Sequence, residues 1–171
     1  MFTNASAVVI SDPNPPNFKD CISFKNMFFN CDSVSADFSI WNVSNIRDMS
    51  FMFHNSKKFK GDISSWDDSN VISIHSMFNG CENFNSNISH WNTSNIKNMG
   101  LTFQGCKKFN QELNNWNVSN VIIMYKTFKD CFNLKSDFSH WNVSNVKNME
   151  GIFENCRNFI SDVSSWDVSK V

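Results

Sequence analysis

Apolar and polar residues recur along this chain with a fixed period of 25 residues, and no insertion or deletion breaks the register after Pro16. A tryptophan marks each period, at Trp41, Trp66, Trp91, Trp116, Trp141 and Trp166. A phenylalanine recurs in phase with it, at Phe28, Phe53, Phe78, Phe103, Phe128 and Phe153. A period of this length is typical of repeated units that stack on one another. Units begin near residues 16, 41, 66, 91, 116 and 141, a partial unit begins at 166, and residues 1–15 form an N-terminal cap or leader.

The first part of each unit has helical spacing of its apolar residues. In the unit that begins at Trp141 they are Val146, Met149, Ile152, Phe153 and Cys156. Spacings of three and four residues place such side chains on one face of a helix. A serine that precedes them, Ser144 in this unit, is a favourable N-cap. The pattern therefore predicts a helix of two to three turns, over residues 145–154 in this unit.

The second part of each unit alternates in polarity. Phe159 and Val163 are apolar, whereas Asp162 and Ser164 are polar, which predicts a short strand with one face inward. One short helix and one short strand per unit define an α/β repeat solenoid with a leucine-rich-repeat-like coil. An all-β coil is the alternative, because phenylalanine, valine and isoleucine also favour strands.

The repeated motif resembles a known family. It reads Trp-Asn-Val-Ser-Asn-Val with Met, Phe, Cys and Phe following at fixed spacing, most clearly over residues 141–164. It is similar to a 25-residue repeat of Mycoplasma surface proteins without an assigned function, and to BspA-like leucine-rich-repeat surface proteins. Phe103, Cys106 and Phe109 match the core of the latter. The resemblance implies protein binding or adhesion at the cell surface. The chain departs from the motif at Asp68 and Ser56, where Val and Cys are usual.

Charge and hydropathy narrow the classes of partner. The formal net charge is −1, so nothing favours binding to nucleic acid or to an anionic membrane. No apolar run approaches the ~18 residues of a membrane span, so we expect no membrane insertion. Residues 1–16 lack the basic and apolar regions of a signal peptide. We therefore expect either that the protein is not secreted or that this chain is a fragment of something longer.

The cysteines are predicted to be reduced. Five of them share one repeat position, at Cys31, Cys81, Cys106, Cys131 and Cys156, and Ser56 takes that position in the remaining unit. Stacked coils place equivalent residues about 4.8 Å apart, whereas a disulfide needs Cβ atoms about 3.8 Å apart. The sequence has no Cys-x-x-Cys pair with matching histidines, so no metal or other cofactor is expected. The four histidines are expected to face solvent.

A line of acidic residues is the first candidate binding surface. It comprises Asp37, Asp62, Glu112, Asp137 and Asp162, with Asn87 in the remaining unit. Like charges stacked at sheet spacing repel one another. Such a line either faces a cationic partner or forms hydrogen bonds to the neighbouring backbone, as Asp does in turns.

The unit that begins at Trp116 provides the second candidate surface. Ile122, Ile123, Tyr125 and Phe132 stand where other units mostly carry polar or charged residues. If they face outward, they form an apolar patch suited to an interface.

These observations favour a noncatalytic protein-binding solenoid that forms part of a cell-surface or adhesion protein. An intracellular structural or interaction scaffold is the alternative. The sequence shows no phosphate-binding loop, nucleophile elbow or metal-binding helix, so we do not expect an enzyme. The protein partner is not identified by the sequence. End-to-end self-association is a further expectation, because the last unit stops after six residues and repeat stacks need capped ends.

Overall fold

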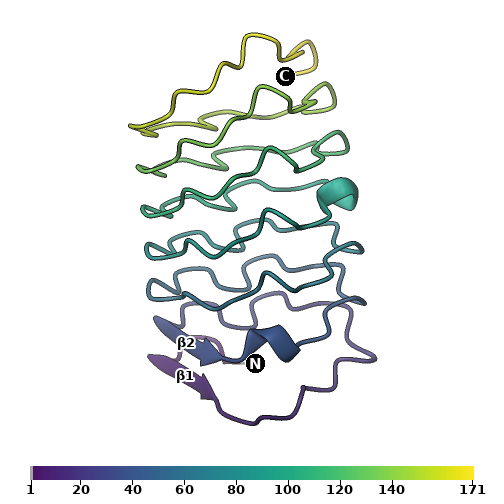
Figure 1. Ribbon diagram of the computed structural model, residues 1–171, viewed down its shortest axis with the longest axis vertical. Helices are drawn as coiled ribbons and strands as arrows, with labels where there is room; N and C mark the ends of the chain where they lie inside the picture. Colours follow the sequence, from purple (N-terminus) through teal and green to yellow (C-terminus); the bar gives the residue numbers. More distant parts are fainter. Residues whose placement is uncertain (1) are drawn as a thin grey trace.

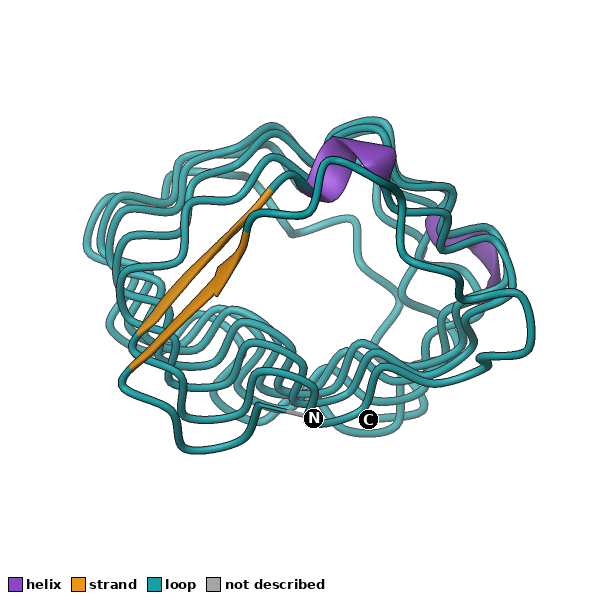
Figure 2. Ribbon diagram, turned by 90° about the horizontal axis from the view of Figure 1, so that it is seen from below, coloured by secondary structure: helices purple, strands orange, loops and turns teal. Residues whose placement is uncertain are grey.

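The chain winds as a stack of coils, one above another, from the N-terminal to the C-terminal end (Figure 1). The computed structural model describes residues 2–171. Its regular elements are strands β1 (Ala7–Ile10) and β2 (Ser33–Ala36) and two short 3-10 helices, η1 (Phe38–Ile40) and η2 (Thr93–Asn95). Seen from below, the coils superimpose closely, with the strands on one side and the helices on another (Figure 2). Turns and extended loops make up the remainder of residues 2–171.

Parallel pairing sets the register between coils. Strands β1 and β2 pair in parallel, with Val8 opposite Val34. Higher in the stack, single parallel bridges join one residue of each coil to the next, through Ser23, Asp48, Ser73, Asn98, Ile123 and Asn148. Successive members of this series are one sequence period apart, so side chains at the same repeat position form columns along the stack.

The predicted α/β fold with a helix in every unit is wrong. Residues 145–154 form turns rather than a helix, and residues 159–164 form no strand. Two backbone positions per coil have positive φ, for example 59° at Phe51 and 57° at Asn55. A right-handed helix excludes such residues, because L-amino acids pay a steric cost in the left-handed region. The chain therefore turns sharply at two positions, four residues apart, in each coil and does not continue as a helix.

The hydrogen bonds explain how this turn-rich segment is satisfied. Alternate N–H groups point to the next coil: Phe53 donates to the Met77 carbonyl at 2.9 Å and Asn55 to the Asn79 carbonyl at 2.7 Å. The intervening N–H groups close tight turns within the coil, such as His54 to the Phe51 carbonyl at 3.2 Å. Buried backbone groups need such partners. Pairing between coils thus replaces the internal bonds of the expected helix.

Aromatic columns fill the centre of the stack. The rings of Phe78, Phe103 and Phe128 are stacked, with centroids 5.8 and 5.5 Å apart. A second column contains the tryptophans, and Trp66 and Trp91 lie 6.4 Å apart. Each indole from Trp66 onward donates from Nε1 to a backbone carbonyl of an earlier coil. This bond satisfies the one polar atom of a buried tryptophan, so the repeated residue fits the interior in every coil.

The N-terminal segment expected as a cap or leader lies against the coil that follows it. The Phe2 N–H donates to the Met27 carbonyl at 3.0 Å, and the Asn4 N–H donates to the Phe29 carbonyl at 2.8 Å. Strand β1 continues this contact through its pairing with β2. Residues 2–10 thereby repeat the backbone pairing seen between later coils, although their sequence does not carry the tryptophan motif.

All six cysteines are unpaired, as the stacking distance predicts. The Cys81 thiol donates to the Phe53 carbonyl at 2.9 Å, and the Ser56 hydroxyl makes the equivalent bond to Phe28 at 3.1 Å. Burial raises the pKa of Cys81 and Cys106 and raises that of Cys156 to about 11. These three thiols are therefore protonated at neutral pH, and a thiol rather than a thiolate is a poor nucleophile.

Thiol titration should report this burial. We expect six reactive thiols once the protein is unfolded without reductant. In the native protein the four buried thiols should react slowly, because they need local opening before a reagent reaches them, whereas the half-buried Cys21 and Cys156 should react first. Fewer than six thiols in unfolded protein would mean that disulfides form between coils.

Candidate functional site

The acidic line is exposed, and most of its members are engaged in local turns. In Asp62 the Oδ1 atom accepts hydrogen bonds from the Ser64 N–H at 3.0 Å and from its hydroxyl at 2.7 Å. Asp37, Asp137 and Asp162 accept the equivalent backbone bond from the serine two residues later. These backbone bonds lower the pKa of Asp62, Asp137 and Asp162. Glu112 is exposed at the same position.

The turn needs an oxygen rather than a charge. Asn87, which replaces aspartate in this line, accepts the same two bonds from Ser89, at 3.0 and 2.8 Å. The hydrogen bonds to neighbouring backbone that the sequence allowed are therefore present. Because Asn87 does the same without a carboxylate, the turn bond does not need the charge, and a cationic partner for the line stays a prediction.

The substitution Asp62→Asn should consequently leave the melting temperature unchanged within error. The amide oxygen replaces the carboxylate oxygen that Ser64 contacts, and exposed changes away from special features have small effects. Thermal unfolding followed by circular dichroism at neutral pH measures this. A clear loss of stability would show that the charge itself is structural, and Asp62→Ala provides the comparison in which the turn bond is lost.

The four apolar residues of the Trp116 unit are only partly brought together. Ile122 and Ile123 are adjacent and remain 37% and 36% exposed. Tyr125 is half-buried, and Lys126 lies over its ring with Nζ 4.7 Å from the centroid. Phe132 belongs to a later turn of the coil and is covered by Arg157 at 4.5 Å. The exposed apolar patch therefore reduces to Ile122 and Ile123.

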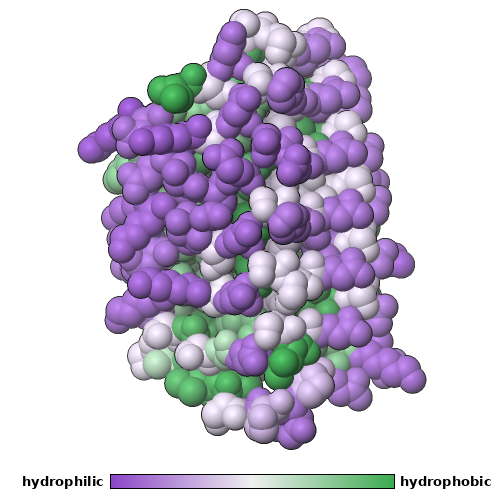
Figure 3. Space-filling model, in the orientation of Figure 1, coloured by the Kyte–Doolittle hydropathy of each residue, from purple (hydrophilic) through white to green (hydrophobic). Residues whose placement is uncertain are grey.

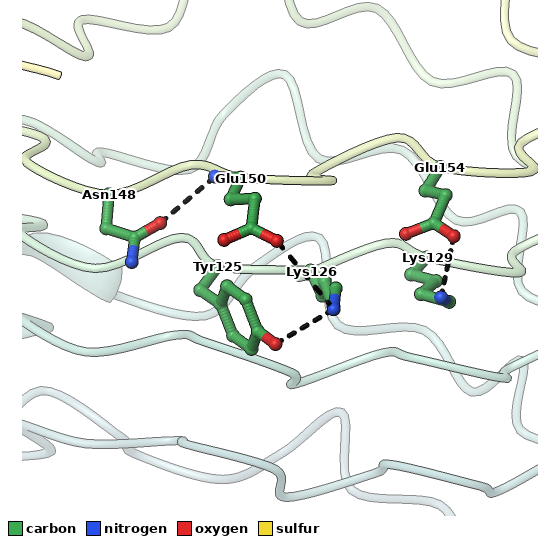
Figure 4. A network of polar contacts seen from close by, with 6 residues as sticks. All are labelled: Tyr125, Lys126, Lys129, Asn148, Glu150 and Glu154. Carbon is green, nitrogen blue, oxygen red and sulfur yellow. Dashed lines mark hydrogen bonds and ion pairs between the residues drawn. The ribbon is translucent and has the colours of Figure 1, made fainter.

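A polar network beside Tyr125 joins two coils (Figure 4). Lys126 Nζ contacts the Tyr125 hydroxyl at 2.9 Å and lies 3.9 Å from Glu150. Lys129 pairs with Glu154 at 2.7 Å. Exposed ion pairs of this kind contribute little to stability, about 0–1 kcal/mol each. Each lysine of the network is paired with a glutamate, so the network carries no net charge to attract a ligand.

A shallow hollow of about 530 Å³ lies next to Ile122. Its walls are three lysines, two asparagines and this isoleucine, namely Lys97, Asn120, Ile122, Asn145, Lys147 and Lys170. These lysines are inconspicuous in the sequence, because basic residues do not form the majority at their repeat position. A comparison of alternate units would have found them, since Lys97 and Lys147 occupy the repeat position of Ile122 two units apart from each other.

Two of the four histidines depart from the expected solvent-facing positions. His54 and His75 are half-buried around Phe51, with ring centroids 5.8 and 5.0 Å from that ring. Burial lowers the pKa of both histidines, so they are mainly neutral at pH 7. His90 and His140 are exposed, as expected.

The only strongly perturbed carboxyl among residues 2–171 is Asp68, which is 2% exposed. Its Oδ1 accepts from the Asn92 N–H at 2.8 Å, while Oδ2 is buried without a partner. Burial raises the pKa of Asp68 to about 6. Perturbed carboxyls often mark active sites, but this one is closed off from solvent.

No group of three or more metal-ligating side chains comes together within residues 2–171. No helix in that range has the length and apolar character of a membrane span.

The structure thus describes a protein of stacked coils with an aromatic interior and a mainly polar surface. In Figure 3 hydrophilic side chains cover the middle of the visible face, and hydrophobic ones gather near the N-terminal end. The family model described as "Mycoplasma protein of unknown function, DUF285" matches residues 22–137 and 87–171. These ranges span most of the chain, so the protein belongs to this family.

The family match confirms the resemblance to Mycoplasma proteins of unknown function. The relation to BspA-like leucine-rich-repeat proteins stays a prediction. Comparison with curated proteins and with solved structures found no match.

Proposed function

We propose that the protein is a noncatalytic protein-binding module that forms part of a cell-surface or adhesion protein. The observation that carries this proposal is the exposed pair Ile122 and Ile123 beside the hollow lined by Lys97 and Lys147. An apolar centre with a charged rim is the usual composition of a protein interface. Exposed apolar residues that lie together, rather than singly, favour such a role.

The distribution of reactive groups supports a binding role over catalysis. Asp68 and the thiols of Cys81, Cys106 and Cys131 are buried away from any substrate. The four aspartates of the acidic line accept the same turn bond from a serine two residues later. General acid and base catalysis requires two groups whose environments separate their pKa values, and exposed copies of one turn do not provide this.

The proposed location at the cell surface has a support separate from that of the binding role. The cell-surface assignment rests on the resemblance to Mycoplasma surface proteins and, more distantly, to BspA-like proteins. An intracellular interaction scaffold is the second candidate, favoured by six unpaired cysteines, because reducing compartments keep thiols free. Labelling intact source cells with a membrane-impermeant reagent separates the two: a labelled protein supports the surface, and one labelled only after lysis supports the scaffold.

Site-specific photocrosslinking in those cells tests the binding role. A crosslinking residue at position 123 should yield a discrete adduct with another protein, identified by mass spectrometry. The matched control places it at Ile160, which is 81% exposed and lies outside the hollow. Addition of excess purified protein should compete for the adduct. Equal patterns from both positions, or no adduct at all, would refute binding through this surface.

A further inference from the structure

Isoleucine and basic residues alternate strictly along one column of the stack. We call it the alternating column, and its members are Ile22, Arg47, Ile72, Lys97, Ile122 and Lys147. Every member is exposed. The backbone repeats in every coil, whereas this pattern repeats in every second coil. Pairing between coils therefore does not require the alternation.

The backbone of the column is held in line by direct hydrogen bonds. The N–H of Lys97 donates to the Ile72 carbonyl at 2.8 Å, and that of Ile122 donates to the Lys97 carbonyl at 2.9 Å. The N–H of Lys147 likewise donates to the Ile122 carbonyl at 2.9 Å. Neighbours joined in this way lie about 4.8 Å apart, as adjacent strands do. The cations consequently recur at about 9.6 Å, with an isoleucine midway between them.

A second column alternates as well, but most of its charged residues have partners within the protein. It comprises Asp32, Lys57, Glu82, Lys107, Phe132 and Arg157. Lys107 pairs with Glu82 at 2.9 Å, and Arg157 covers Phe132 at 4.5 Å. In the alternating column the neighbours of each cation are isoleucines. The ion pairs found within residues 2–171 include none of its three basic residues.

The hollow lies at the C-terminal half of the alternating column. Lys97, Ile122 and Lys147 come from three successive coils, and Lys170 adds a further cation whose Nζ donates to Asn145 Oδ1 at 2.8 Å. The flanking asparagine Asn120 is fixed by its own bond to the Ser94 carbonyl at 2.8 Å. The surface thus offers positive charge and an apolar contact on a firm backbone, and its charge is complementary to an anionic partner.

We propose that the alternating column binds an acidic peptide segment in the polyproline II conformation, with a carboxylate at every third residue. This conformation rises about 3.1 Å per residue with three residues per turn, so equivalent side chains recur at about 9.3 Å. That repeat matches the ~9.6 Å between cations to within a few tenths of an ångström. The apolar residues between the carboxylates, proline among them, contact the isoleucines.

Nucleic acid fits this column less well. In double-stranded DNA the charges of one strand recur at about 3.4 Å along the helix axis, so roughly three of them would share each cation. Single-stranded nucleic acids also stack their bases on exposed aromatic side chains, and the members of this column between the cations are isoleucines. The proposed peptide partner makes the function proposed above more specific and rests on it.

Fluorescence polarisation with a labelled peptide of four Glu-Pro-Pro triplets tests the proposal. The double variant Lys97→Ala/Lys147→Ala should weaken binding at least fivefold. The matched control Lys60→Ala/Lys108→Ala removes the same charge from exposed sites outside the column and should bind as the parent does. Binding should also weaken with added salt, because exposed charges are screened. Equal losses in the two double variants would overturn the proposal.

A charge-preserving exchange tests the spacing itself. The variant Lys97→Ile/Ile122→Lys keeps composition and net charge but places the two cations in adjacent coils. It should lose most of the affinity for the spaced peptide, and a peptide with the same residues in blocks of four glutamates and eight prolines should bind the parent weakly. Unchanged affinity in the exchanged variant would overturn the proposal, as would binding of heparin or single-stranded DNA in preference to the spaced peptide. Circular dichroism melts confirm that each variant is folded.

The outcome separates this inference from the proposed function. A partner crosslinked at position 123 together with no binding of the spaced peptide refutes the inference and leaves the binding module intact. Spacing-dependent binding of the peptide supports both. The absence of a crosslinked partner and of peptide binding refutes both.

Discussion

Replacing Phe103 by alanine is expected to lower the free energy of unfolding by about 3–5 kcal/mol, the usual cost of removing a buried phenylalanine. Phe103 is fully buried. Its ring lies 5.5 Å from that of Phe128 and 4.4 Å from that of Phe109. Truncation opens a cavity in the middle of the aromatic column, and the hydrogen-bonded coils above and below cannot close it without breaking their register.

Urea unfolding measures this loss, with Phe132→Ala as the control. Phe132 is half-buried and contacts Arg157 at the surface, so its truncation should cost much less. Stacked coils transmit stability through their neighbours, so the Phe103→Ala transition should also broaden if the two halves of the stack begin to unfold separately. A similar cost for both substitutions would contradict the assigned interior.

The sequence identified the register and the interior, because a strict period constrains both. Phe103, Cys106 and Trp116 each stand at a fixed position of the period, and all three are buried. The reduced cysteines followed from the distance between stacked coils. The same period indicated Asp68 as a departure, although only the structure shows its carboxyl oxygen without a partner.

The helix was predicted wrongly because the turns imitate its spacing. In each coil, two residues with left-handed backbone conformation lie four positions apart. The turns at these residues direct every third or fourth side chain inward, which is also the spacing of one helix face. One of these positions carries Asn55, Gly80 and Asp130, residue types that favour such a conformation. The other carries Phe51 and Leu101, which have no such preference. Pairing between coils imposes their conformation, and a local reading of sequence does not contain that information.

The surroundings of the candidate site residues depend on the neighbouring coils, and both candidate surfaces stay predictions. The acidic line is conspicuous in sequence, yet its oxygens accept hydrogen bonds from serines two residues later. Of the apolar residues in the Trp116 unit, Tyr125 and Phe132 are covered by cations of neighbouring residues or coils. Exposure depends on what the next coil places above a residue. The residues of the alternating column form one continuous surface only when the coils are stacked.

Asp68→Val should stabilise the protein at neutral pH by about 1–3 kcal/mol. Valine occupies the equivalent, buried position at Val43, Val118 and Val143, so it fits the column. Burial raises the pKa of Asp68 to about 6 in the folded protein, from an ordinary value of 3.8. The folded state therefore holds the proton more strongly than the unfolded state, and stability falls as pH rises from about 4 to about 6. A shift of about two units corresponds to about 3 kcal/mol once the carboxyl is ionised.

The difference in stability between Asp68→Val and the parent should therefore shrink towards zero as the pH is lowered from 7 to 4. Comparison with the parent at each pH cancels the opposite trend of His54 and His75, whose lowered pKa values make acid destabilising. Asp68→Asn keeps an oxygen for the Asn92 N–H without ionising, so its stability relative to the valine variant should not change with pH. Urea unfolding at pH 4, 5.5 and 7 measures all three proteins. A difference in free energy of unfolding that stayed constant between pH 7 and pH 4 would contradict this prediction. It would mean that the ionised carboxyl of Asp68 is not destabilising and is solvated in solution.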